Sequence, residues 1–105
     1  MIEHIETDCL YPSFDTVRLI AFPTKEGLRV TDDAGAARTA WLHGADDKLT
    51  AQAIRAAAIR YGAEIDGKTI YAVAHAPEWK RSAILAVANA SAEAARDALN
   101  TARPA

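Results

Sequence analysis

The sequence predicts a small single domain of the α+β class, with an antiparallel sheet of about four strands and two or three helices in the order βββαβα(α). Three observations lead to this prediction. The length of 105 residues suits one domain. Apolar and polar residues alternate over short segments in the first part of the chain, and alanine-rich segments with helical spacing dominate the second part.

Two sheet segments are clear and one is weak. Residues 16–22 and 28–32 alternate between apolar and polar side chains, and a connection of hairpin length joins them. Residues 2–10 alternate weakly and are expected to form an edge strand. These three segments predict an antiparallel meander.

A further strand is predicted over residues 37–43. Ala40 and Leu42 would lie on one side of this strand, and Trp41 and His43 would lie on the other, more polar side. Trp41 is therefore a candidate anchor for a partner, because interfaces favour tryptophan, tyrosine and arginine.

Helical spacing begins after Gly44. A helix is predicted over residues 48–61, with Asp46 or Asp47 as its N-terminal cap and Gly62 as its C-terminal stop. Its apolar stripe is expected to consist of Leu49, Ala53, Ile54, Ala57, Ala58 and Tyr61.

The remainder of the chain predicts one strand followed by helix. Residues 69–74 are apolar on both sides, which is typical of a central strand covered by helices. A helix is expected to start at Pro77 and to end near residue 89, with a further helix capped by Ser91 and reaching residue 102; one long helix is the alternative. Residues 101–105 are expected to fray.

Composition limits the core and the cellular setting. Half of the residues are hydrophobic, but 25 of the 105 are alanine, so we expect a thin core that a homodimer or a protein partner would extend. The single cysteine, Cys9, fits a reducing compartment. The sequence contains neither a signal peptide nor a stretch apolar enough for a membrane, which predicts a cytoplasmic protein without membrane contact.

The charge is unevenly distributed. Residues 1–15 contain four acidic residues and no basic one, whereas the rest of the chain carries a small positive excess. The acidic residues are Glu3, Glu6, Asp8 and Asp15. A solvated edge is the favoured interpretation, and an acidic face that docks on a basic partner is the alternative.

No pattern of catalytic or metal-binding residues is found. The three histidines and Cys9 lack the paired spacing of metal ligands, and the glycines occur singly rather than in a phosphate-binding loop. We therefore expect no enzyme activity, no cofactor and no metal site. A small enzyme that uses Cys9 or His75 is kept as the last alternative.

The most suggestive cluster lies where a strand leads into a helix. Trp79, Lys80 and Arg81 occupy the first helical turn, where an aromatic face and two positive charges could contact a protein or a nucleic acid. The favoured interpretation places Trp79 in the core and the two cations in water.

Residues 17–88 resemble a large polyvalent protein-associated domain of plasmid mobilisation proteins. The resemblance is carried by the segments GLRVTDD, LTAQAIRAAAIRYG, TIYAVAHA and PEWKRSAILAVA. It implies a mobile-element setting and an accessory role, and it transfers no catalytic residue.

The first functional hypothesis is a non-enzymatic protein-interaction module of a phage or plasmid that inhibits or adapts a host complex handling nucleic acid. Its expected partner-binding residues are Trp41, His43, Trp79, Lys80, Arg81, Glu3, Glu6 and Asp8. The alternative is an accessory nucleic-acid-contacting domain in DNA mobilisation that uses Arg55, Arg60, Lys80 and Arg81.

Overall fold

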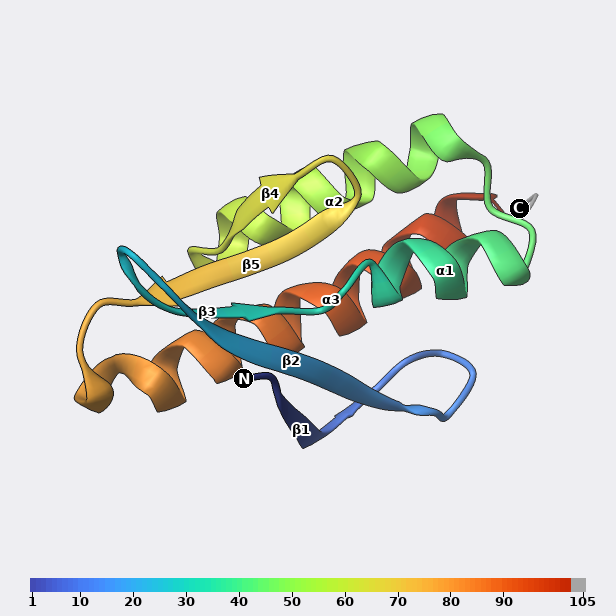
Figure 1. The fold of residues 1–105 in the computed structure, drawn as a ribbon. Coiled ribbons are helices and arrows are strands. Elements are labelled where there is room, and N and C mark those ends of the chain that lie inside the picture. Colours follow the sequence, from blue (N-terminus) through green and yellow to red (C-terminus); the bar gives the residue numbers. More distant parts are fainter. Residues whose placement is uncertain (103–105) are drawn as a thin grey trace.

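A computed structural model describes residues 1–102, with the backbone alone for residues 101 and 102. Over these residues the structure contains five strands, three α-helices and one turn of 3-10 helix, and Figure 1 shows their arrangement. In chain order these are β1 (Glu3–Leu10), β2 (Thr16–Thr24), β3 (Gly27–Thr31), α1 (Gly35–Leu42), α2 (Asp47–Tyr61), β4 (Glu64–Asp66), β5 (Thr69–Ala74), η1 (Pro77–Trp79) and α3 (Lys80–Ala102). The α+β class is thus confirmed.

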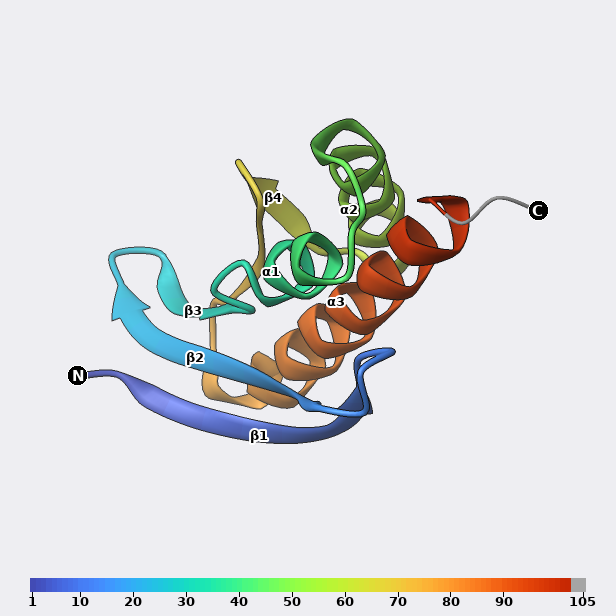
Figure 2. The same cartoon turned by 90° about the vertical axis from the view of Figure 1, so that its right-hand side faces the viewer.

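The five strands form one sheet in the order β1-β2-β3-β5-β4, and every neighbouring pair is antiparallel. All three α-helices lie on the same side of this sheet (Figure 2). Helix α3 packs on the strands, and α1 and α2 pack against α3. The core therefore lies between one face of the sheet and α3.

Alternation along the strands directs the apolar side chains to this core. Val17, Leu19 and Ala21 of β2 are buried, as are Val30 of β3 and Ile70 of β5. The helices meet through small side chains, which let their backbones approach closely. Buried alanines on α2 and α3 include Ala57, Ala58, Ala94 and Ala95.

Most predicted elements are confirmed. The strands expected at residues 2–10, 16–22, 28–32 and 69–74 correspond to β1, β2, β3 and β5. The Asp46 carboxylate accepts the Leu49 N–H at 2.8 Å at the start of α2, and Gly62 ends α2 with a φ of 73°. Of the two alternatives for the last segment, one long helix is observed. Residues 101 and 102 belong to α3, and residues 103–105 lie outside the described part of the chain.

The strand predicted at residues 37–43 is wrong, because these residues belong to helix α1. Ala36, Ala37 and Ala40 are buried on one face of this helix at helical spacing. Alanine has the highest helix propensity, and it outweighs the short apolar–polar alternation around Trp41. The change from strand to helix therefore occurs after Thr31 rather than at Gly44.

The expectation that helices cover both faces of β5 is also wrong. Ile70, Ala72 and Ala74 face the helices, whereas Tyr71 and Val73 lie on the other face of the sheet, opposite Thr31 and Arg29 of β3. The Arg29 guanidinium stacks 3.7 Å above the Tyr71 ring on that outer face. The outer face of β5 therefore consists of half-buried side chains, and no second layer of helices within residues 1–102 covers it.

One buried carboxylate joins the sheet to the helices. Asp32, which follows β3 directly, has no solvent-exposed surface. Its Oδ1 accepts the N–H groups of Ala34 and Ile70, both at 3.0 Å. Its Oδ2 accepts the Ala36 N–H at 3.2 Å and the Ser91 hydroxyl at 2.7 Å. Asp32 therefore connects the end of β3, the start of α1, β5 and α3.

A buried tyrosine extends this network. The Tyr11 and Ser91 hydroxyl oxygens are 2.7 Å apart. Burial raises the pKa of Tyr11 to about 12, so its hydroxyl keeps its proton and donates to Ser91, which in turn donates to Asp32. Glycine is required at position 35, because a Cβ atom there would lie 2.3 Å from the Tyr11 hydroxyl.

Removing the carboxylate should destabilise the protein strongly. The Asp32→Ala substitution leaves three N–H groups and the Ser91 hydroxyl without their acceptor, and an unsatisfied buried donor costs about 1–3 kcal/mol. We expect the free energy of unfolding, measured with urea, to fall by at least about 3 kcal/mol. The matched control is Asp33→Asn, at an exposed neighbour with a φ of 51° that asparagine tolerates. It should change stability by less than about 0.5 kcal/mol, and equal effects would contradict this role of Asp32.

Asp32 should also make stability depend on pH. Burial raises its pKa above the ordinary 3.8, and hydrogen bonds from Ile70, Ser91, Ala36 and Ala34 oppose the shift only in part. The native state therefore binds the Asp32 proton more tightly than the unfolded state does. The protonated Asp32 contributes fully to the free energy of unfolding below pH 3.8, and this contribution is lost as the pH rises through the pKa of the folded state. The stability advantage over Asp32→Asn in urea unfolding should shrink as the pH rises above 3.8. An advantage that grows with pH would mean that the hydrogen bonds outweigh burial.

Candidate functional site

The candidate site lies where β5 leads into α3. The strand ends at Ala74, and Pro77 begins η1. Its fixed backbone angle suits the first position of a helix, where its missing N–H would have no partner within the helix. The Trp79 N–H donates to the Ala76 carbonyl at 3.0 Å and closes this turn. The sharp turn gives the junction two sides, one facing β3 and the other facing α2.

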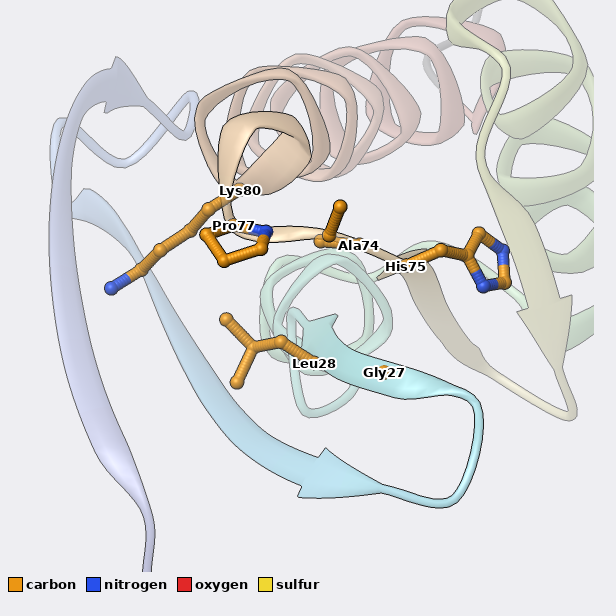
Figure 3. Close-up of a pocket in the computed structure, with 7 residues that line it drawn as sticks. Gly27, Leu28, Ala74, His75, Pro77 and Lys80 are labelled. Carbon is orange, nitrogen blue, oxygen red and sulfur yellow. The ribbon is translucent and has the colours of Figure 1, made fainter.

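A small apolar hollow lies on the β3 side. Its volume is about 310 Å³, and its lining residues are Gly27, Leu28, Ala74, His75, Ala76, Pro77 and Lys80. Figure 3 shows Leu28, Ala74 and Pro77 around the hollow, with the Lys80 side chain extending towards β1. The Lys80 Nζ binds both carboxylate oxygens of Glu3, at 2.9 and 3.2 Å. Its charge is thus engaged by β1.

A second hollow, which we call the Trp79 groove, lies on the α2 side of the junction. Its volume is about 350 Å³, and its lining residues are Tyr61, Gly62, Ala72, Val73, His75, Trp79, Ser82, Ala83 and Ala86. Two aromatic side chains, Trp79 at 58% exposure and Tyr61 at 37%, line the groove together with mostly small residues. This combination leaves room for a side chain from another molecule.

The tyrosine wall of the groove is held in place from α3. The Tyr61 hydroxyl donates to Glu93 Oε1 at 3.2 Å, which raises the pKa of Tyr61. The same carboxylate pairs with Arg60 and, at 3.7 Å, with Arg96. A position fixed in this way reduces the entropy that a bound partner would have to remove.

The structure separates the two predicted tryptophan anchors. Trp41 and His43 lie at the end of α1, where the His43 Nδ1 is 2.9 Å from the Thr39 carbonyl oxygen. That helix packs beside the C-terminal half of α3, whereas Trp79 lies just before its first residue (Figure 1). Because α3 has 23 residues and spans about 34 Å, Trp41 and Trp79 belong to different surfaces.

The structure also corrects the predicted environment of Trp79. The favoured interpretation placed its side chain in the core, but Trp79 is exposed and packs only partly. Tyr61, expected in the apolar stripe of its helix, faces the groove instead. Both residues lie at helix ends, where helical spacing does not determine which side chains are covered.

The predicted acidic edge is neutralised in part. Glu3 pairs with Lys80, and Glu6 pairs with Arg18 at 3.3 Å, while Asp8 is exposed without an ion pair among residues 1–102. Of the four cations expected to contact nucleic acid, Arg60 and Lys80 are held in ion pairs. These pairs reduce the free charge of both sets, and Arg55 and Arg81 are the two expected cations without an ion pair among residues 1–102.

Cys9 and His75 are the remaining candidate residues, and each side chain lies beside a polar group of another segment. Cys9 is half-buried, with its Sγ 3.7 Å from Asn89 Oδ1, and the His75 Nδ1 is 3.0 Å from the Glu26 carbonyl oxygen. Within residues 1–102, no three histidine, cysteine or acidic side chains come together as a metal site would require. In the same range, no helix has the length and apolar character that crossing a bilayer demands.

Comparison with known proteins finds no matching family model, no matching curated protein and no matching solved structure. The resemblance to the domain of plasmid mobilisation proteins stays a prediction.

The exposure of Trp79 can be measured directly. In the Trp41→Phe variant, Trp79 is the only tryptophan of the chain. Because its side chain is 58% exposed, its fluorescence in the folded protein should be readily quenched by both acrylamide and iodide. Protection from iodide comparable to that of a buried tryptophan would contradict the open groove. The Trp79→Phe variant supplies the matching measurement for Trp41.

Proposed function

We propose that this chain is a non-enzymatic protein-binding module that holds its partner at the Trp79 groove. The observation that carries the proposal is the pairing of two exposed aromatic side chains, Trp79 and Tyr61, across a hollow formed largely by small residues. Aromatic residues beside an unfilled pocket are typical of the few positions that dominate binding energy at protein interfaces.

The form of the groove also fits a protein partner better than a small polar metabolite. Its lining consists mainly of alanine, valine and aromatic groups, with Ser82 and His75 as the polar side chains apart from the Tyr61 hydroxyl. The cationic side chains of Arg60 and Lys80 are engaged by Glu93 and Glu3. Arg81, which precedes the lining residue Ser82, is exposed and forms no ion pair within residues 1–102, so it is the cation beside the groove that could attract a phosphate.

The proposal extends to the biological setting through the resemblance alone. A plasmid- or phage-encoded accessory protein would use such a groove to inhibit or adapt a host complex that handles nucleic acid. The cytoplasmic location and the absence of catalysis are parts of the same proposal.

Site-specific photo-cross-linking tests the proposed surface. A photoreactive amino acid at position 79 should give discrete cross-linked protein adducts in the cell that encodes this chain. The matched control carries the same amino acid at Ile59, which is 75% exposed on α2 but does not line the groove. Adducts at position 79 that disappear on Tyr61→Ala support the proposal. Equal adducts at both positions, or none at position 79, contradict it.

A further inference from the structure

The edge of β5 is only partly covered by β4. The Asp32 N–H donates to the Ile70 carbonyl at 3.0 Å, so the backbone groups of Ile70 point towards β3. In an antiparallel sheet these directions alternate along a strand, and the N–H and C=O of Tyr71 and Val73 therefore point to the opposite side. There β4 begins at Glu64, opposite Tyr71.

The backbone of Val73 is consequently left without a strand partner. The residues that precede β4 are Gly62, whose left-handed conformation ends α2, and Ala63, whose N–H donates to Ala58 of α2. Among residues 1–102, no backbone or side-chain group hydrogen-bonds to the Val73 N–H or C=O on this side. An open strand edge of this kind accepts an additional extended chain.

This open edge lies within the Trp79 groove, because Ala72, Val73 and His75 are among its lining residues. A chain paired with Val73 would place the residue opposite Val73 on the outer face of the sheet. The residues before and after it would point to the helix side, where Trp79, Ala83 and Ala86 lie. An added strand could therefore pair with the Val73 backbone and place a side chain in the Trp79 groove at the same time.

We propose that the Trp79 groove binds an extended peptide segment of a partner protein, which adds a short strand to the edge of β5 and inserts one apolar side chain against Trp79. This inference rests on the proposed function and specifies its mode of recognition. The free edge covers only residues 72–74, so the bound segment needs about three to five residues in extended conformation.

The recessed position of the edge favours a single peptide chain over the sheet of a second copy. Tyr61 and Gly62 at the end of α2 and Trp79 of η1 line the same hollow as Val73, and they would obstruct a folded sheet edge. The outer strands β1 and β4 also have free edges, and Glu3, Glu6 and Asp8 lie on β1.

The experiment selects ligands from a displayed library of random 12-residue peptides on the immobilised full chain. The selected peptides are then titrated into the labelled protein while hydrogen exchange of individual amides is followed by NMR. In the free protein the Val73 N–H should exchange much faster than the Ala72 N–H, which faces β3. On binding, exchange at Val73 should slow at least about tenfold, as expected for a newly formed backbone hydrogen bond.

Variants separate backbone pairing from pocket filling. The Val73→Pro substitution removes the one N–H that faces the free edge, where proline is tolerated, and should weaken peptide binding at least about tenfold. Its matched control, Val73→Thr, keeps the N–H and the β-branched shape and should bind like the original chain. The Ala86→Leu substitution should weaken peptide binding, because the larger side chain fills the groove. Methylation of the peptide nitrogen that donates to the Val73 carbonyl should also weaken binding, because it removes that hydrogen bond. The peptide test does not depend on Val73→Pro folding.

The possible outcomes separate the extended mode of peptide binding from the protein-binding function itself. Peptides that bind with protection of Val73 and with sensitivity to N-methylation support strand addition. Four outcomes overturn strand addition. The library yields no binders, the bound peptides are helical, binding leaves the exchange rate of the Val73 N–H unchanged, or the chain self-associates through the same edge. If position 79 still cross-links specifically to a partner in those cases, the protein-binding function stands and only the extended mode fails.

Discussion

The buried carboxylate of Asp32 is the constraint on which the rest of the fold depends. It binds backbone groups of α1 and β5 and the Ser91 hydroxyl of α3, so a single side chain sets the position of one strand and two helices relative to the end of β3. Its environment is dry, and ionisation there is costly unless every oxygen is satisfied. Four donors offset this cost in part, and Gly35 lies close to the Tyr11 hydroxyl in the same crowded region.

Alanine determines the shape of the molecule around this centre. Because the helices meet through alanine, α3 lies close to both the sheet and α2, and few large side chains fill the space between them. The same composition has a second effect at the surface. At the junction of β5 and α3 the small side chains of Ala72, Ala83 and Ala86 do not fill the space beside Trp79 and Tyr61, and the Trp79 groove results.

The sequence predicts the elements whose determinants are local. Alternation identified the four longer strands, and the cap at Asp46 with the stop at Gly62 located α2. The prediction failed for α1 for two reasons. The alternation around Trp41 coincides with an alanine-rich stretch whose helix propensity is higher, and the Asp32 carboxylate that accepts the Ala36 N–H takes this role only when β5 and α3 are folded around it. The site was predicted in part: Trp79 was singled out, but its exposure, the role of Tyr61 and the separation from Trp41 depend on how α2 and α3 pack. Nothing local in the sequence signals the open edge at Val73, because that edge arises from the short length of β4.

The left-handed conformation at the end of α2 determines whether β4 can extend along the edge of β5. Gly62 and Ala63 are the residues of this chain that could continue β4 and pair with Val73, but the conformation of Gly62 ties both to the end of α2. An extended conformation at residues 62 and 63 would close the sheet with the protein's own backbone. The conformation of Gly62 therefore keeps residues 62 and 63 from pairing with the Val73 backbone.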